Sequence, residues 1–135
     1  GLHYVIPVMR DAGGGSIMIT SSGAGVKGSP NTACYNTSKH AVIGLMRCAA
    51  LECAQFGIRV NTVNPGAVET RMMESIEAGF AAVGAGDFKS MVKAVTPLGR
   101  YGQPDEIANM MVFLGSDESS YCTGSVYMVD GGNAT

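Results

Sequence analysis

The feature that most constrains this chain is the alternation of short apolar runs, rich in β-branched residues, with long segments of helical periodicity. Residues 16–22 and "IRVNTVNPG" (58–66) read as strands, and "SVYMVDGG" (125–132) reads as a strand followed by a turn. Residues 33–56 carry apolar side chains at positions 42, 45, 46, 49, 50 and 53, which predicts a helix with a broad buried face. Continuous apolar strands separated by helices favour an α/β fold, a doubly wound parallel sheet with helices on both faces.

Turn and capping signals set the limits of the other elements. Residues 1–10 read as the end of a helix, which the flexible run 11–15 stops, and Gly57 is a candidate C-terminal cap of the central helix. Pro104 begins a further helix that runs to about Leu114, with acidic residues in its first turn. Residues 70–96 are mixed and contain glycine, which indicates short helices in a mobile excursion. No repeat or linker divides residues 1–135, so they belong to one domain.

The composition limits the partners of the chain. Of its 135 residues, 46% are hydrophobic and 15% are charged, which indicates a well-buried globular domain. The nine Lys and Arg residues form no basic stripe against eleven Asp and Glu residues, so we expect no nucleic acid partner. No apolar run approaches the roughly 18 residues of a membrane span, so we expect no membrane partner either. The four cysteines form no C-x-x-C pair, which favours free thiols in a reducing cytosol and no metal site.

A glycine-rich motif follows the first strand. Gly23, Gly25 and Gly28 have the Gly-x-Gly-x-x-Gly spacing that is typical of dinucleotide binding. In that motif the helix opens within the glycines, so that its first amides face the pyrophosphate. Here residues 29–32 form a loop, and the helical pattern starts only near Ala33. We therefore interpret the motif as an ordinary glycine-rich loop between a strand and a helix.

Three other residues carry a more specific chemical pattern. Ser22 lies at the C-terminal end of the first strand, where ligands bind in open α/β sheets. Thirteen residues later, Tyr35 and Lys39 are spaced i, i+4, so they share one face of a helix. A phenol titrates near pH 10, and a neighbouring ammonium stabilises its phenolate form. Such a tyrosine can exchange a proton with an alcohol or a ketone, and a serine hydroxyl can hydrogen-bond the same oxygen. A lone Tyr-x-x-x-Lys pair also arises by chance on solvated helix faces.

In combination with its surroundings, the pattern resembles the short-chain dehydrogenase/reductase family. The resemblance covers nearly the whole chain and rests on "SIMITSS", "YNTSKHAVIGLMRCAALECAQFGIRVNTVNPGAVET", "PLGRYGQPDEIANMMVFLGS" and "YCTGSVYMVDGG". It implies a Rossmann-like fold, and an enzyme that interconverts a secondary alcohol and a ketone with a nicotinamide cofactor. The implied substrate is therefore a small-molecule alcohol or ketone.

The resemblance also implies roles for individual residues. Tyr35 is the general acid/base, Ser22 holds the substrate oxygen, and Lys39 assists the tyrosine and hydrogen-bonds the ribose beside the nicotinamide. Four further residues, which follow the second strand, would contact the cofactor: Pro65, Gly66, Val68 and Thr70. The excursion 70–96 corresponds to the segment that covers the substrate in this family. Three of its apolar residues are therefore expected to line the substrate pocket: Met72, Met73 and Ile76.

The chain departs from the family pattern at its beginning. The family's glycine-rich phosphate loop and the residue that selects NAD or NADP have no match among residues 1–135. We therefore expect only the C-terminal, catalytic half of the domain, and the choice between NAD and NADP stays open with a slight preference for NAD. The resemblance further implies a homodimer or homotetramer, with the Tyr-bearing helix and the last strand in subunit contacts. The alternative is a truncated or split chain without activity that acts only by assembling with a fuller subunit.

Overall fold

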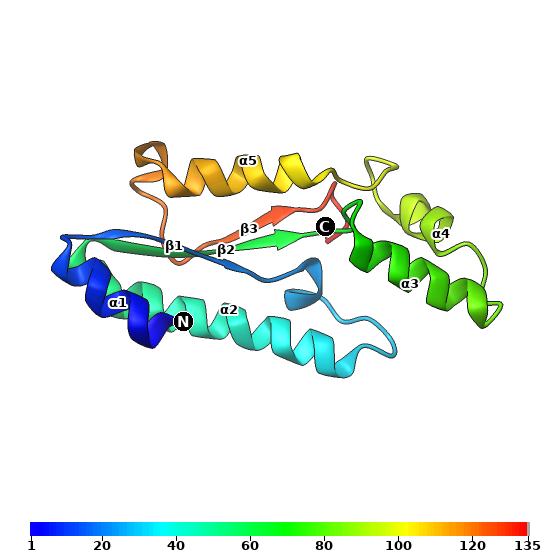
Figure 1. Cartoon of the computed structure of the whole chain (residues 1–135), viewed down its shortest axis with the longest axis horizontal. Coiled ribbons are helices and arrows are strands. Elements are labelled where there is room, and N and C mark those ends of the chain that lie inside the picture. Colours follow the sequence, from blue (N-terminus) through cyan, green and yellow to red (C-terminus); the bar gives the residue numbers. More distant parts are fainter. Residues whose placement is uncertain (135) are drawn as a thin grey trace.

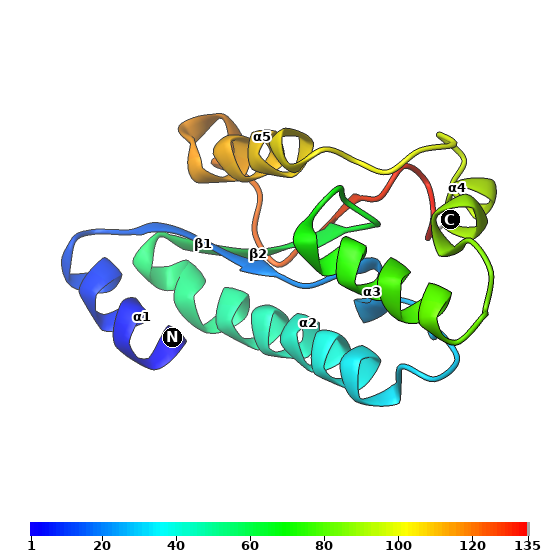
Figure 2. The ribbon, with the colours of Figure 1, turned by 45° about the vertical axis from the view of Figure 1, so that its right-hand side comes forward.

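A three-stranded parallel sheet between two layers of helices makes up the chain (Figure 1). The computed structural model describes residues 1–134. The elements in chain order are α1 (Leu2–Asp11), β1 (Gly15–Thr20), α2 (Ala33–Cys53), β2 (Ile58–Pro65), α3 (Arg71–Ala82), α4 (Phe88–Val95), α5 (Pro104–Gly115) and β3 (Val126–Val129). Helices α1 and α2 cover one face of the sheet and α5 covers the other (Figures 1 and 2). This arrangement confirms the predicted α/β fold with helices on both faces.

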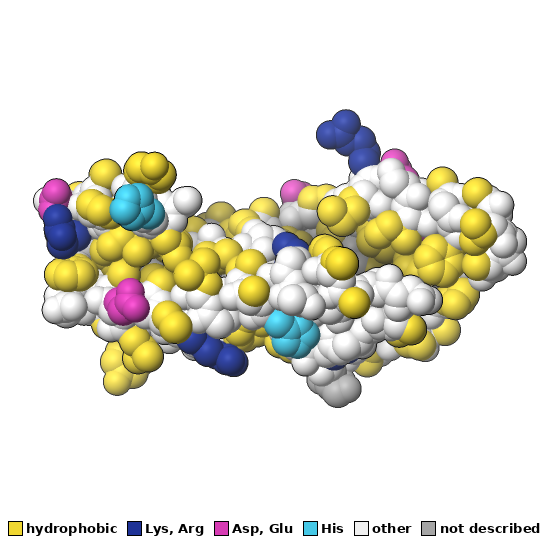
Figure 3. Space-filling model, turned by 90° about the horizontal axis from the view of Figure 1, so that it is seen from below, with side chains coloured by type: hydrophobic (Ala, Val, Ile, Leu, Met, Phe, Trp, Pro, Cys, Tyr) yellow, Lys and Arg dark blue, Asp and Glu magenta, His cyan; other side chains and the backbone are white. Residues whose placement is uncertain are grey.

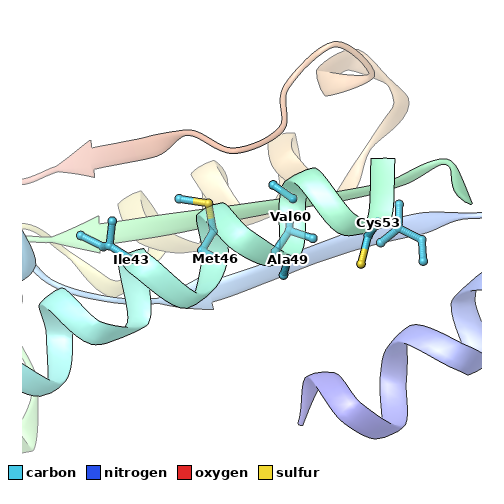
Figure 4. Packing of buried hydrophobic residues seen from close by; sticks show 7 residues of the cluster. Ile43, Met46, Ala49, Cys53 and Val60 are labelled. Atoms are coloured by element: carbon cyan, nitrogen blue, oxygen red, sulfur yellow. The ribbon is translucent and has the colours of Figure 1, made fainter. Parts of the chain in front are cut away.

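Strand β2 is the central strand of the sheet and the most deeply buried of the three. It pairs in parallel with β1, where Gly15 lies opposite Ile58, and with β3, where Thr62 lies opposite Val126. Side chains alternate between the two faces of a strand. Ile58 and Val60 therefore both point toward α2, and they join a buried cluster with one side of that helix (Figure 4). The α2 members of the cluster are Ile43, Met46, Ala49, Ala50 and Cys53.

The prediction of α2 was right in its position and partly wrong in its buried face. The helix spans Ala33–Cys53, a short 3-10 turn extends it to Phe56, and Gly57 ends it with φ +68°. Ile43 is buried against the sheet, whereas Leu45 is 53% exposed. Two residues rotate a helix by about 200°, so these two side chains point in nearly opposite directions. An apolar residue on the outward side of a helix cannot be told from a core residue by type alone.

The glycine-rich loop has the form that the sequence predicts. Strand β1 ends at Thr20, two residues earlier than expected, because the chain turns into a 3-10 turn at Gly23–Gly25. Helix α2 then starts at Ala33, so the glycines do not open it. Gly25 packs directly against this helix: a Cβ atom there would lie 2.9 Å from Ile43 Cδ1 and 3.0 Å from the Lys39 carbonyl oxygen. The glycine is therefore needed for close packing of the loop on α2.

Residues 70–96, called the covering segment below, fold into α3 and α4 beyond the C-terminal ends of the strands (Figure 2). The predicted short helices are thus confirmed. The two helices contact each other through Phe80 and Phe88, whose ring centroids are 4.4 Å apart. The N-terminal half of α2 lies at the same end of the sheet in both ribbon views (Figures 1 and 2).

The outward face of α1 and α2 carries many hydrophobic side chains (Figure 3). Tyr4 and Val8 of α1 and Leu45 and Leu51 of α2 are all more than half exposed. No helix within residues 1–134 combines the length and the apolar character needed to cross a bilayer.

Arg59, on the central strand β2, forms hydrogen bonds with the residues at the C-terminal end of α5 and just after it. Its guanidinium donates to the carbonyl oxygens of Leu114 and Ser116 at 3.0 Å each, and to Ser119 Oγ at 2.8 Å. Hydrogen bonds from a charged donor contribute about 1.5–3 kcal/mol each, and their loss leaves carbonyls unpaired. We expect Arg59→Met to lower the free energy of unfolding by about 2–3 kcal/mol in urea denaturation. Arg47→Met, on the exposed side of α2, is the matched control, and equal denaturation midpoints for the two variants would contradict the prediction.

An ion pair at the other end of α5 predicts a pH dependence of stability. Arg100 Nη1 and Nη2 donate to Glu106 Oε2 and Oε1 at 2.8 and 2.7 Å, and the Gln103 N–H donates to the same carboxylate at 2.7 Å. These bonds lower the pKa of Glu106 to about 2.

Because this pKa lies below the value of about 4.3 in an unfolded chain, the pair stabilises the fold fully above about pH 5. The contribution is lost as the pH falls toward 2. We expect Glu106→Gln to remove part of the loss of stability between pH 5 and pH 3, measured as urea midpoints. The neighbouring Asp105→Asn should keep the wild-type dependence.

Candidate active site

Tyr35 and Lys39 lie one turn apart near the start of α2, on the same side of the helix. The Lys39 ammonium is 5.6 Å from the centroid of the Tyr35 ring. It also donates a hydrogen bond to the carbonyl oxygen of Thr20, at the end of β1, with an N–O distance of 3.2 Å. Tyr35 is 43% exposed, so its hydroxyl is open to a ligand. The predicted i, i+4 pair thus lies at the C-terminal end of β1, with the Tyr35 ring beside the positive charge of Lys39.

Ser22 follows β1 in extended conformation and caps the 3-10 turn. Its Oγ accepts a hydrogen bond from the Ala24 N–H at 3.1 Å. A serine hydroxyl has one hydrogen to donate and two lone pairs. Since a lone pair is used within the turn, the hydrogen stays available for an oxygen outside it. Ser22 thus keeps a hydrogen to donate, and it lies at the same end of the sheet as Tyr35.

Two residues that the sequence analysis did not single out hold this arrangement together. Ser21 is buried, and its hydroxyl donates to the carbonyl oxygen of Lys39 at 3.0 Å, which joins the strand end to α2. Asn64 is fully buried, and its amide donates to the carbonyl oxygen of Ser22 at 2.7 Å. Both contacts depend on which residues of β1 and β2 lie side by side. Only the Ser-Ser pair and the position of Asn64 before a Pro-Gly turn could have drawn attention to them.

The segment after β2 presents unused backbone groups. Glu69 N–H donates to the carbonyl oxygen of Gly102, and Gly102 N–H donates to that of Ala67. In this parallel pairing the N–H and C=O of Val68 point to the other side, and within residues 1–134 neither takes part in a hydrogen bond. One donor and one acceptor side by side match a primary carboxamide, which offers one of each.

The remaining predicted cofactor residues lie in the same segment. Pro65 is the last residue of β2, and Gly66 N–H donates to the carbonyl oxygen of Val129 at 3.0 Å. Thr70 caps α3 with its backbone, and its hydroxyl forms no capping hydrogen bond. Thr70 is an exposed residue, so its side chain is accessible to a ligand.

The predicted substrate residues all lie on α3. Met72 is 64% exposed, Ile76 is 37% exposed, and Met73 is half-buried. Within residues 1–134, two cavities lie away from Ser22, Tyr35 and Lys39. One of about 460 Å³ has Ala67, Gly102 and Asp130 among its lining residues, and one of about 570 Å³ lies between α3 and α4. Ser22, Tyr35 and Lys39 line neither cavity and lie at the C-terminal end of the sheet.

These residues fit the nicotinamide half of a dinucleotide. Lys39 uses one of its three donors, on Thr20, so two remain for ribose hydroxyls. The unpaired N–H and C=O of Val68 fit the carboxamide of a nicotinamide ring. Within residues 1–134 the glycine-rich loop does not have the form of a phosphate loop, since it is packed against α2 at Gly25.

Comparisons with known proteins identify relatives of this chain. A family model described as enoyl-(acyl carrier protein) reductase matches residues 1–134. The chain is 44% identical over 130 residues to cyclohexanol dehydrogenase of Acinetobacter sp. strain SE19, an alignment that covers 96% of this chain and 47% of that protein. The crystal structure of levodione reductase superposes with a TM-score of 0.94 at 36% identity, over 99% of this chain and 52% of the other.

A third similarity concerns a structure with a bound cofactor. ElxO with NADP bound superposes with a TM-score of 0.85 at 30% identity, over 98% of this chain and 51% of ElxO. The chain thus spans about half the length of the relatives it matches. The match of the family model over residues 1–134 places this chain in the short-chain dehydrogenase/reductase family.

Proposed function

We propose that the chain is the catalytic, substrate-binding half of an NAD(P)-dependent oxidoreductase that interconverts a secondary alcohol and a ketone. The proposal is supported by the position of Tyr35, Lys39 and Ser22, which all lie at the C-terminal end of the sheet. The lysine lies 5.6 Å from the tyrosine ring, and the serine is left with a hydrogen to donate. The similarity to cyclohexanol dehydrogenase makes a cyclic secondary alcohol the first substrate to test.

The proposed mechanism assigns one task to each side chain. A nicotinamide cofactor, when bound, would supply the hydride acceptor for the oxidation and the hydride donor for the reverse reaction. Tyr35 Oη, as phenolate, takes the proton of the substrate hydroxyl, and in the reverse direction it returns this proton to the ketone oxygen. Ser22 donates a hydrogen bond to the same oxygen in both directions. Lys39 would assist Tyr35 from its position beside the ring, where its ammonium lies 5.6 Å from the ring centroid.

The cofactor contacts are proposed on the residues that remain open. Val68 would hold the carboxamide through its backbone, Thr70 would offer its hydroxyl, and Lys39 would donate to the ribose. Pro65 and Gly66 would lie against the nicotinamide ring. NADP in the related ElxO structure shows that a relative binds the phosphorylated form. Both cofactors therefore belong in the test.

The rest of the domain is part of the proposal. The chain matches about half of each relative, and within the described residues β1 has no partner on its outer side. We propose that further strands with the phosphate-binding loop pair with this edge in the complete protein.

The exposed apolar residues of α2 support an oligomer that buries this helix between subunits. The four cysteines are unpaired thiols, which supports a reducing, cytoplasmic location.

The test uses the full-length protein with cyclohexanol and other cyclic and open-chain secondary alcohols, each with NAD and with NADP. Formation of reduced nicotinamide with at least one pair is the expected result. A folded full-length protein that binds neither cofactor and turns over none of the alcohols would contradict the proposal. It would favour the alternative of a chain that acts by assembly with another subunit.

A further inference from the structure

Lys89, near the start of α4, connects the covering segment to the proposed nicotinamide site. Its ammonium lies 2.9 Å from each carboxylate oxygen of Glu69, the residue between Val68 and Thr70. Within residues 71–94, Lys89 is the one residue whose side chain forms an ion pair. Its partner, Glu69, lies outside the covering segment. The contact therefore joins a helix of this segment to the backbone that would hold the cofactor.

The other side of the Lys89 ammonium faces an aromatic ring. It lies 5.1 Å from the centroid of Tyr101, which is 2% exposed and follows the covering segment in the chain. A cation over an aromatic face gains about 0.5–1 kcal/mol when exposed and more when desolvated. Tyr101 is anchored in turn, because its neighbour Gly102 pairs with Val68 and Arg100 donates to its carbonyl oxygen at 2.9 Å. Lys89 is thus held between a fixed ring and the Glu69 carboxylate.

The charges around Lys89 strengthen this attachment. The hydrogen bond that Lys89 donates to Glu69 is the main reason that the pKa of Lys89 is raised, and the charges of Glu77 and Glu74 on α3 add to it. Burial raises the pKa of the Tyr101 hydroxyl to about 12, and nearby carboxylates add to the effect. This hydroxyl is buried without a well-formed hydrogen bond. Lys89 therefore interacts with the ring face of Tyr101 rather than with its hydroxyl.

We propose that Lys89 is a positioning residue that couples the covering segment to the Val68–Thr70 backbone through Glu69. A nicotinamide ring on Val68 fixes this backbone, and with it the Glu69 carboxylate. The carboxylate then holds α4 through Lys89, and α4 holds α3 through the Phe80–Phe88 contact. Bound cofactor would thereby hold α3 in the position in which its side chains line the substrate pocket. The inference rests on the proposed function, because it assigns Val68 to the nicotinamide.

The experiment follows amide hydrogen exchange of residues 71–95 in the full-length protein, with and without NADH or NADPH. In the wild type, the reduced cofactor is expected to slow exchange across α3 and α4. In Lys89→Met, exchange of α4 is expected to be about threefold to tenfold faster without cofactor, and the slowing by cofactor is lost. The cofactor Kd should stay within about twofold, and the KM for cyclohexanol should rise about threefold to tenfold with kcat nearly unchanged.

Three further variants separate coupling from a general loss of structure. Lys93→Met removes a lysine of the same helix that forms no ion pair among residues 1–134, and it should behave as the wild type. Lys89→Arg should keep the coupling, because arginine binds carboxylates and stacks on aromatic rings. Tyr101→Phe should keep it as well, because the ring remains.

Two results would overturn the inference. One is a Lys89→Met variant with the wild-type response to cofactor, and the other is a Lys93→Met variant that loses this response equally. In a wild type that binds cofactor and oxidises an alcohol, either result counts against Lys89 alone. A wild type that binds no cofactor counts against the proposed function, and the coupling then falls with it.

Discussion

Replacing Tyr35 by Phe in the full-length protein is expected to lower kcat for alcohol oxidation by about 10²–10⁴-fold and to leave the cofactor Kd within about twofold. The change removes one oxygen atom, the one that takes the substrate proton, and leaves the ring beside Lys39. Without this oxygen the nearest general base is solvent. The loss should therefore appear in kcat and kcat/KM alike, as for a group that acts only in the transition state.

The measurement is steady-state kinetics, together with fluorescence titration of the reduced cofactor. Tyr121→Phe is the matched control, since Tyr121 is fully exposed and lies outside the site. Its kinetics should equal those of the wild type. Turnover by Tyr35→Phe at the wild-type rate would remove the tyrosine from the mechanism.

The second large effect concerns the glycine-rich loop. Gly25→Ala is expected to lower the free energy of unfolding by about 2 kcal/mol, because the new methyl group overpacks the contact with α2. It would collide with Ser21 Oγ and lie 2.9 Å from Ile43 Cδ1 and 3.0 Å from the Lys39 carbonyl oxygen. Relief of this overlap moves α2 away from the strand end. The Ser21 bond to Lys39 is then strained, and kcat should fall by about tenfold or more.

Gly28→Ala is the control from the same motif. A Cβ atom at Gly28 meets nothing within 4 Å, so the change should alter stability by less than about 0.5 kcal/mol. In a phosphate-binding loop, by contrast, the glycines serve the approach of the pyrophosphate, and both substitutions would weaken cofactor binding. Urea denaturation and the cofactor Kd of the two variants therefore separate these interpretations. A loss of cofactor affinity in Gly28→Ala equal to that in Gly25→Ala would contradict the packing role.

The fold was predictable from the sequence because its signals are local. The β-branched run before Ser22 and the helical spacing of residues 33–56 specify a strand and a helix without reference to the rest of the chain. The proximity of Tyr35 and Lys39 was predictable for the same reason, since a helix brings positions i and i+4 together. That the glycines do not open the helix could be predicted from the late start of the helical pattern, and α2 indeed begins at Ala33.

The supports of the site were not predictable because they depend on tertiary contacts. The bond from Asn64 to Ser22 requires the register in which Thr20 lies opposite Val63. The Lys89–Glu69 pair requires the path of the chain through α3 and α4. Likewise, nothing local distinguishes Leu45, which is exposed, from the buried Ile43 on the same helix. Such contacts join residues far apart in the sequence, and residue type alone does not identify the partner.

The parallel pairing of the strands has a consequence for how the chain reaches its structure. Each rung between β1 and β2 joins residues about forty positions apart, and each rung between β2 and β3 joins residues about sixty positions apart. The entropy of closing these loops must be overcome before any strand contact stabilises the chain, whereas α2 forms from neighbouring residues within microseconds. Folding is therefore slow by the standard of small helical domains. During this interval β2 is an unpaired strand that exposes Ile58, Val60 and Val63, so aggregation during synthesis depends on the rate of strand pairing rather than on the final stability.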